Sequence, residues 1–365
     1  MQNSAYYCHV NAIERVIAAL NHQEPDRVPI WTLIDSSAVM RHFAPTDVDP
    51  TPLRDRSNSN SPLMAEVTAA ALEGLGIDAT FLVGMGLYNP FPREAATFQV
   101  LGSGSEGFTS IEDVRAYTPE MPTYEEIEAE TVDRFRKFER LLGPDVFLVD
   151  QGGVSFDWAH NIIGLDLFCL ALYDAPSDIT RILEAFTERE RIKAQVYANN
   201  ELSSAYQIGG DIAGKNGVFF SPDYIRREIM PLFKRQIEPL KEKGIKIIYH
   251  SDGNIMEILD DLVDAGIDGL NPIETTAGMD LGLIKKRYGK NLVLIGNVDA
   301  NIMTFGTPEE VAEDVRRCIR DAAAGGGFCL DTGAGEIMPG YPVENVIRFC
   351  EAAYEYGKYP LGSAL

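Results

Sequence analysis

Cysteine is sparse in this chain of 365 residues, and its placement suggests no disulfide framework. There are five cysteines, an odd number, and no Cys-x-x-Cys motif joins any two of them. They are scattered along the chain at Cys8, Cys169, Cys318, Cys329 and Cys350. We therefore expect a protein of the reducing cytoplasm.

Positive charge is also scarce. The sequence has 32 Lys and Arg against 55 Asp and Glu, a net charge of −23 and a pI of about 4.6. Such an acidic surface repels phosphate backbones and anionic lipids, so we expect neither a nucleic-acid nor a membrane partner. It also disfavours a polyanionic substrate unless a local basic pocket exists. No apolar run approaches about 18 residues, which predicts no transmembrane helix, and residues 1–10 show no basic-then-apolar signal pattern.

Short apolar runs alternate with helical patterns along the chain. Strands are predicted at 28–31, 79–83, 146–150, 205–208, 245–249, 270–273, 292–298 and 328–331. Helices are predicted near 11–20, 65–75, 125–142, 162–172, 176–199, from 221 onward, and near 254–265, 280–287, 308–323 and 342–356. A doubly wound open sheet fits this period, but no G-x-G-x-x-G follows the first strand. About eight strands spread over the chain favour a single (β/α)8 barrel domain over residues 1–365, with an N-terminal helical extension and an insertion near 88–125.

Polar residues follow four consecutive apolar runs in the second half of the chain. The run 245–249 leads into HSDGN at 250–254, and the later runs end in NPIE at 271–274, GNVD at 296–299 and DTGAGE at 331–336. The active site of a (β/α)8 barrel is built from such residues at the carboxyl ends of its strands. We expect the cleft to be lined by Trp31, Gln151, Asp211, Tyr249, His250, Glu274 and Asn297.

Each candidate has a structural alternative. His250 is either a metal ligand or general acid/base, or a histidine that hydrogen-bonds a loop. Asp252 either acts in the site or caps a helix that begins near 254. Glu274 ends an apolar strand and must find a cation or several donors, because burying an unpaired carboxylate is unfavourable. Asp211 follows the strand at 205–208 and is a further catalytic candidate.

Several motifs together resemble the uroporphyrinogen decarboxylase superfamily. They are RVIAALNHQEPDRVPIW (15–31), GGDIAGKNGVFFSPDYIRREIMPLFK (209–234), HSDGN (250–254), GIDGLNPIE (266–274), LIGNVD (294–299), GTPEEV (306–311) and GAGEIMPGYPVENV (333–346). The resemblance implies a (β/α)8 barrel with its site at the carboxyl ends of the strands, and it makes a homodimer plausible. One branch of the superfamily decarboxylates uroporphyrinogen without a cofactor. The other comprises methyltransferases that work with corrinoid proteins, many of them using zinc.

The first strand distinguishes the branches. The decarboxylases carry an Arg-Gln-Ala-Gly-Arg stretch after it, which helps to hold substrate carboxylates. Here the corresponding segment 32–38 reads TLIDSSA and has no arginine before Arg41. An octa-anionic substrate without that clamp, on a protein of charge −23, is physically unfavourable. We therefore expect the methyltransferase branch.

The metal site of that branch is changed here. Zinc methyltransferases that act on thiols typically use a His-x-Cys pair and a later Cys, but this chain has Asp252 in the pair and Gly335 near the later position. Carboxylates and imidazole suit harder chemistry than thiolates do. We expect zinc to be held by His250 with Asp252, Glu274 or Glu336 and to act on an ether oxygen. If the metal has been lost, Asp or Glu protonates the leaving oxygen directly.

These considerations predict a methyltransferase of anaerobic metabolism that moves a methyl group from a small donor, first an O-methyl aromatic ether, to cob(I)alamin. His250, Asp252, Glu274 and Asp211 are the expected catalytic residues. The chain contains no Asp-x-His-x-x-Gly, so the corrinoid is expected on a separate partner protein. The alternatives are a cofactor-independent decarboxylase, a transferase from methylcorrinoid to an acceptor, and an inactive barrel that only docks a corrinoid protein.

Overall fold

The computed structural model describes residues 10–45, 62–82 and 108–362. Its central feature is a ring of parallel strands. They are β2 (Ala79–Phe81), β3 (Phe147–Val149), β4 (Gln151–Gly153), β5 (Ala205–Gly209), β8 (Lys246–His250), β9 (Gly269–Asn271), β10 (Val293–Val298) and β11 (Phe328–Thr332). The last six of these strands form one sheet in the order β11-β10-β9-β8-β5-β4, and the first two, β2 and β3, pair with each other. Only Asp150 separates β3 from β4, so these two continue one strand direction.

Residues 28–32 close the ring. Ile30 bridges to Leu330 of β11 and Trp31 bridges to Ala79 of β2, both in parallel orientation. Backbone hydrogen bonds join Trp31 N to Leu330 O at 2.9 Å and Thr32 N to Ala79 O at 3.1 Å. Eight parallel strand directions therefore follow one another around a circuit, and the predicted (β/α)8 barrel is confirmed.

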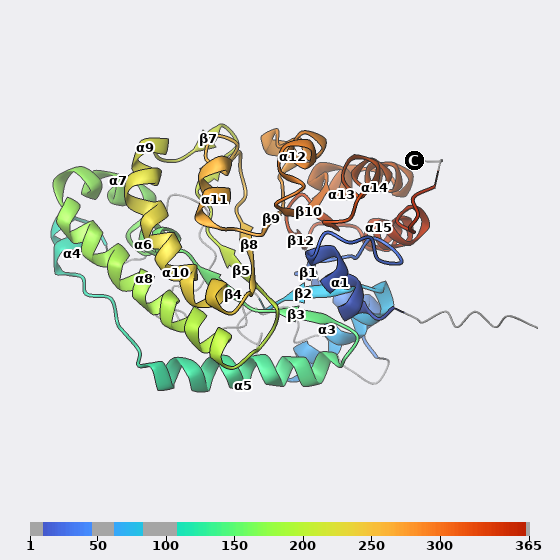
Figure 1. Cartoon of the computed structure of the whole chain (residues 1–365), viewed down its shortest axis with the longest axis horizontal. Coiled ribbons are helices and arrows are strands. Elements are labelled where there is room, and N and C mark those ends of the chain that lie inside the picture. Colours follow the sequence, from blue (N-terminus) through green and yellow to red (C-terminus); the bar gives the residue numbers. More distant parts are fainter. Residues whose placement is uncertain (1–9, 46–61, 83–107, 363–365) are drawn as a thin grey trace, which may run out of the picture.

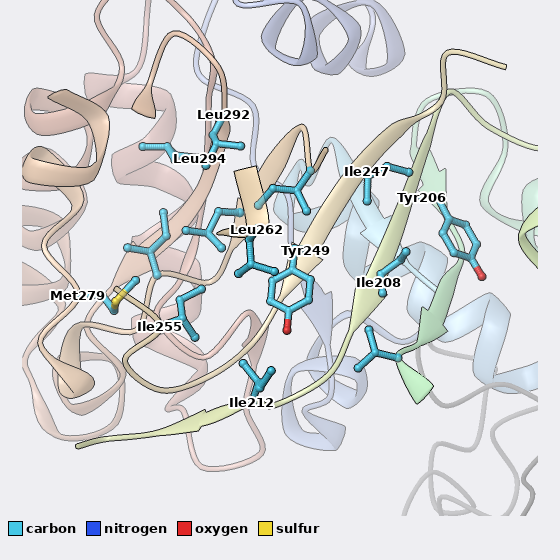
Figure 2. Close-up of a cluster of buried hydrophobic side chains, with 14 of the residues drawn as sticks. Tyr206, Ile208, Ile212, Ile247, Tyr249, Ile255, Leu262, Met279, Leu292 and Leu294 are labelled. Atoms are coloured by element: carbon cyan, nitrogen blue, oxygen red, sulfur yellow. The ribbon is translucent and has the colours of Figure 1, made fainter. Parts of the chain in front are cut away.

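Alternate residues of each strand face opposite sides of the barrel wall. In β8, Ile248 belongs to an inner apolar cluster that also contains Trp31, Phe81, Phe147 and Cys329. Its neighbours Ile247 and Tyr249 belong to the larger cluster between strands and helices. Figure 2 shows this outer layer, with Tyr249 among Ile208, Ile255 and Leu262. The same alternation turns His250 inward at the carboxyl end of β8.

Helix α1 (Ala12–Leu20) closes the amino end of the barrel, as predicted for the N-terminal extension. Asn11 and Glu14 form a capping box at its start. Val16, Ala19 and Leu20 pack into the inner apolar cluster, and the helix lies beside β2 and β3 (Figure 1). The amino end therefore has an apolar floor.

A buried ion cluster stands beside that floor, at the amino ends of the first two strands. Asp78 accepts hydrogen bonds from Arg15 Nη1 at 2.7 Å, from Arg27 Nη1 and Nη2 at 2.7 and 2.8 Å, and from the backbone N of Ile30 at 2.8 Å. Arg15 also pairs with Asp26. Both oxygens of the buried Asp78 carboxylate are thus compensated.

The outer layer of helices covers the barrel wall. Its longer members are α3 (Pro62–Leu75), α5 (Tyr124–Leu142), α8 (Pro176–Asn199), α10 (Met230–Glu242), α14 (Pro308–Ala322) and α15 (Val343–Tyr356). Shorter helices are α2 (Ser37–Phe43), α4 (Ile111–Ala116), α6 (Ser155–Ile163), α7 (Leu165–Asp174), α9 (Pro222–Tyr224), α11 (Leu259–Ala265), α12 (Leu281–Tyr288) and α13 (Ala300–Phe305), with a π-helical turn at Ile225–Ile229 and a 3-10 turn at Thr275–Ala277. Short strand pairs are β1 (Leu33–Ile34) with β12 (Glu336–Ile337), and β6 (Ala213–Gly214) with β7 (Gly217–Val218).

Two predicted helices differ from the structure. The helix expected at 162–172 is split into α6 and α7 by Gly164, whose φ is +90°. The helix expected from 254 begins only at Leu259. Most of the insertion predicted near 88–125 lies outside the described residues, which resume at 108 and include α4. None of the helices in the described part of the chain combines the length and apolar character needed to cross a bilayer.

Candidate active site

Three ionisable side chains meet where β5 and β8 end. Gly209 of β5 lies in register with His250 of β8, so the loops that follow these strands start side by side. One potential ligand atom from each of Asp211, His250 and Asp252 lies within 4.8 Å of the other two. The structure therefore brings together three of the four residues expected to be catalytic, and we refer to them as the strand-end triad.

The loop that carries Asp252 is held by close backbone contacts. Gly253 has a φ of +83°, and a Cβ there would lie 2.5 Å from the backbone of Ala213 in the β6–β7 hairpin. The backbone N of Asp252 donates to Asp211 Oδ1 at 2.9 Å. Among the described residues, however, nothing hydrogen-bonds the buried Oδ1 of Asp252. Asp252 caps no helix, since α11 starts seven residues later.

The triad is electrostatically coupled. Burial raises the pKa of Asp252 to about 6, and the carboxylates of Asp211 and Glu274 add to this rise, while His250 opposes it. For His250, burial acts to lower the pKa, but the charges of Asp252 and Asp211 outweigh it and the pKa is raised. The site can therefore hold or release a proton close to neutral pH.

Glu274 lies next to the triad but outside it. One of its oxygens accepts from Gly253 N at 2.7 Å and the other from the hydroxyl of Thr276. Its carboxylate thus finds its donors in the turn and holds the Gly253 loop in place, and its role as a metal ligand stays a prediction.

Glu336 is likewise absent from the cluster of potential ligand atoms in the described residues. It begins β12, and its charge contributes to the raised pKa of His250 after burial, the two aspartates and Asn271. The backbone of Gly335 lies against His250 instead: a Cβ at Gly335 would be 3.1 Å from Cε1 of the imidazole. Asp211, which follows β5, stands in the triad in the place expected for Glu336, and the role of Glu336 as a ligand stays a prediction.

Three of the four residues expected to bind substrate point elsewhere. Trp31 lies inside the barrel wall, 5.4 Å from Phe81 and 5.8 Å from Phe147 between ring centroids. Tyr249 faces the outer helices, because it is adjacent to the inward His250, and its hydroxyl donates to Gly210 O at 3.1 Å. Asn297 donates to Ile273 O at 3.0 Å and accepts from Arg317 of α14.

Gln151 is the fourth, and the structure keeps it near the triad. Its Nε2 lies 2.3 Å from where a Cβ on Gly209 would stand, so the glycine at the end of β5 makes room for this amide. Asp299, by contrast, caps α13 through the backbone N–H groups of Asn301 and Ile302.

A buried polar network beneath His250 was not predicted. Asn271 ends β9 and its side-chain oxygen lies 2.6 Å from Nδ1 of His250. The same amide contacts Gln207 of β5 and Asp331 of β11. Burial raises the pKa of Asp331 to about 7, although the hydrogen bonds that its carboxylate accepts act to lower this pKa. The alternation of side chains along each strand would have indicated this network, because it places Gln207, Asn271 and Asp331 on the inward face of their strands.

Comparison with known proteins gives a consistent family. A family model described as uroporphyrinogen decarboxylase (URO-D) matches residues 11–356. Uroporphyrinogen decarboxylases of Chromohalobacter salexigens and Alkalilimnicola ehrlichii are 23% and 24% identical, each over 94% of this chain and over 97% and 93% of their own lengths.

Two solved structures share the fold. A methyltransferase from Methanosarcina mazei superposes with a TM-score of 0.72 at 20% identity, covering 95% of this chain and 99% of its own. A B12-independent methionine synthase from Shewanella sp. gives a TM-score of 0.52 at 14% identity, covering 91% of this chain and 96% of its own. At these identities the likeness establishes the fold alone.

Proposed function

The chain belongs to the uroporphyrinogen decarboxylase family, and from that premise we propose that it transfers a methyl group from a small methylated donor to a corrinoid carried by a separate protein. The family contains decarboxylases and methyltransferases, so the assignment depends on the site. The donor proposed first is an O-methyl aromatic ether. The cytoplasm is the proposed compartment.

The strand-end triad is the observation that carries this proposal. Asp211 and Asp252 place two carboxylates beside one imidazole, and His250 is the charge that lowers the pKa of Asp252. A substrate with eight carboxylates would be repelled by such a site. The segment 32–38 supplies no arginine either. A neutral methoxylated molecule meets no such repulsion.

The triad also fits zinc. It offers one imidazole nitrogen and two carboxylate oxygens, which are zinc ligands, and a catalytic zinc site needs three protein ligands. The buried Oδ1 of Asp252, without a donor among the described residues, is the kind of oxygen that a cation would satisfy. Bound zinc would supply a Lewis acid for the leaving oxygen. His250, Asp211 and Asp252 are the residues proposed to hold it.

The proposed reaction balances at the methyl carbon. The cobalt(I) of the corrinoid attacks this carbon in line, the C–O bond breaks, and its electron pair stays on the leaving oxygen. Cobalt(I) becomes methyl-cobalt(III), and the oxygen leaves as an alcohol or phenol after taking a proton. If no zinc is bound, Asp252, whose pKa is raised by burial to about 6, can hold that proton at a carboxylate oxygen.

The donor class follows from the ligands. Carboxylate and imidazole groups form a harder site than the thiolates of thiol-specific relatives, and a hard site favours oxygen over sulfur. The competing candidate is decarboxylation of a porphyrinogen-like acid, which the names of the curated relatives favour. A transfer from methylcorrinoid to an acceptor uses the same site in reverse.

One assay separates these reactions. The purified protein is incubated with a reduced corrinoid protein and a panel of methyl donors, and the cobalt state is followed by absorbance while porphyrinogen products are assayed in parallel. We expect alkylation of cobalt(I) with an O-methyl donor and no decarboxylation. Decarboxylation of uroporphyrinogen, with no change in cobalt state for any donor, would reverse the assignment.

A further inference from the structure

Asn271 is the hub of the polar network beneath the strand-end triad. It is fully buried at the end of β9 and lies in register with His250 of β8. Its Oδ1 is 2.6 Å from Nδ1 of His250 and accepts from Nε2 of Gln207 at 3.3 Å, while its Nδ2 donates to Oδ2 of Asp331 at 3.1 Å. One amide therefore connects four strands of the barrel.

The neighbours of Asn271 decide which way its amide faces. Asp331 Oδ1 accepts from the backbone N of Thr332 at 2.7 Å, which anchors this carboxylate in the floor of the site. The ionised Asp331 carboxylate accepts a hydrogen bond and Gln207 Nε2 donates to the amide oxygen, so the NH2 group of Asn271 faces Asp331 and its oxygen faces His250. An amide oxygen cannot donate. The hydrogen atom in the 2.6 Å contact must then belong to Nδ1 of His250.

We propose that Asn271, held by Asp331 and Gln207, is the positioning residue that fixes the Nδ1–H tautomer of His250 and leaves the Nε2 lone pair for the cluster with Asp211 and Asp252. In neutral imidazole one nitrogen donates and the other accepts, so fixing one fixes both. The inference rests on the proposed function only in giving that lone pair the task of holding zinc. Histidine ligands in metal sites commonly donate their other ring N–H to an oxygen in this way.

Gly335 leaves room for the same arrangement. A Cβ at this position would lie 3.0 Å from Asn271 Oδ1 and 3.1 Å from His250 Cε1, and the φ of Gly335 is +73°. A side chain here would therefore crowd the contact between the amide and the ring, which the glycine leaves undisturbed.

Nitrogen NMR of the metal-free protein tests the tautomer directly. The protein is labelled with ¹⁵N-histidine and recorded at a pH where His250 is neutral, and the His250→Ala spectrum identifies its signals. We expect a protonated, pyrrole-type Nδ1 and an unprotonated, pyridine-type Nε2. The opposite pattern would overturn the inference without any variant being needed.

Variants of Asn271 test its role. Asn271→Leu removes the acceptor and should mix the two tautomers and weaken zinc binding by about 10- to 100-fold in a chelator competition. Asn271→Asp keeps an acceptor oxygen and should retain the Nδ1–H tautomer. The matched control is Asn345→Leu, which removes another buried amide that donates to Met303 O and Gly306 O, and should leave the tautomer and zinc affinity unchanged.

The outcomes separate this inference from the proposed function. If Asn271→Leu keeps both the Nδ1–H tautomer and the wild-type zinc affinity, Asn271 is not a positioning residue. If Asn271→Leu does not fold, loss of the tautomer in Asn271→Asp overturns the inference and its retention supports it. If the wild type shows the expected tautomer but alkylates no corrinoid, the proposed function fails and the positioning role stands.

Discussion

The two ends of the barrel treat buried charge in opposite ways. At the amino end, Asp78 receives hydrogen bonds from two guanidinium groups and one backbone N–H. At the carboxyl end, Asp252 has a buried oxygen with no hydrogen-bond donor among the described residues, and Asp211 repels it. A compensated charge maintains the fold, whereas an uncompensated one lowers stability and remains available to a ligand. The difference locates function at the carboxyl end.

The strongest test of the amino end is Asp78→Ala. It leaves two buried guanidinium groups without their common acceptor, so the free energy of unfolding should fall by about 3–5 kcal/mol. Urea unfolding measures the change through the midpoint at constant m-value. Asp26→Ala is the matched control, because this carboxylate pairs with the same Arg15 but is 43% exposed, and we expect a loss below about 1 kcal/mol. Equal losses in both variants would mean that the buried cluster stabilises the fold no more than an exposed ion pair does.

At the carboxyl end, His250→Ala should impair zinc binding and activity and leave stability nearly unchanged. We expect zinc binding and methyl transfer to fall at least about 100-fold, because an imidazole ligand is lost, while the free energy of unfolding changes by less than about 1 kcal/mol. Metal analysis, the cobalt alkylation assay and circular dichroism measure these quantities. Full activity with stoichiometric metal in the variant would make His250 structural.

Asp252→Asn tests whether the uncompensated carboxylate lowers stability. The folded pKa of Asp252, about 6, lies above the ordinary value of 3.8, so its favourable contribution is complete below pH 3.8 and is lost as the pH rises through 6. The free energy of unfolding of the metal-free variant should therefore equal that of the wild type near pH 4 and be higher by about 1–3 kcal/mol at pH 8. Urea unfolding across this range gives the difference. A gap that does not change with pH would contradict the account.

The smallest expected effect is at Tyr249, one residue from His250 but on the other face of the wall. Tyr249→Phe removes the hydrogen bond to Gly210 O and should lower the free energy of unfolding by about 1 kcal/mol. The KM for the methyl donor should not change, since the hydroxyl faces the outer helices. A marked rise in KM without a loss of stability would return Tyr249 to the substrate cleft.

The sequence was sufficient for the barrel and for the position of His250. Strand and helix periods are local, and both reflect which face of an element is buried. The period of two also speaks against Tyr249 as a cleft residue. Adjacent strand residues face opposite sides of the wall, so Tyr249 and His250 cannot both face the cleft. Glu274 and Asp211 were not separable by sequence, because both are carboxylates after a strand. Only the folded loops show that Gly253 N donates a hydrogen bond to Glu274, whereas Asp211 lies beside His250.

The central claim is that the carboxyl-end charge is a ligand site, and anomalous diffraction at the zinc edge tests it most directly. Crystals grown with zinc should show one strong peak bounded by Asp211, His250 and Asp252, and none beside Asp78 at the amino end. A zinc peak at another place, or no peak in crystals of protein that alkylates cobalt(I), would contradict the account.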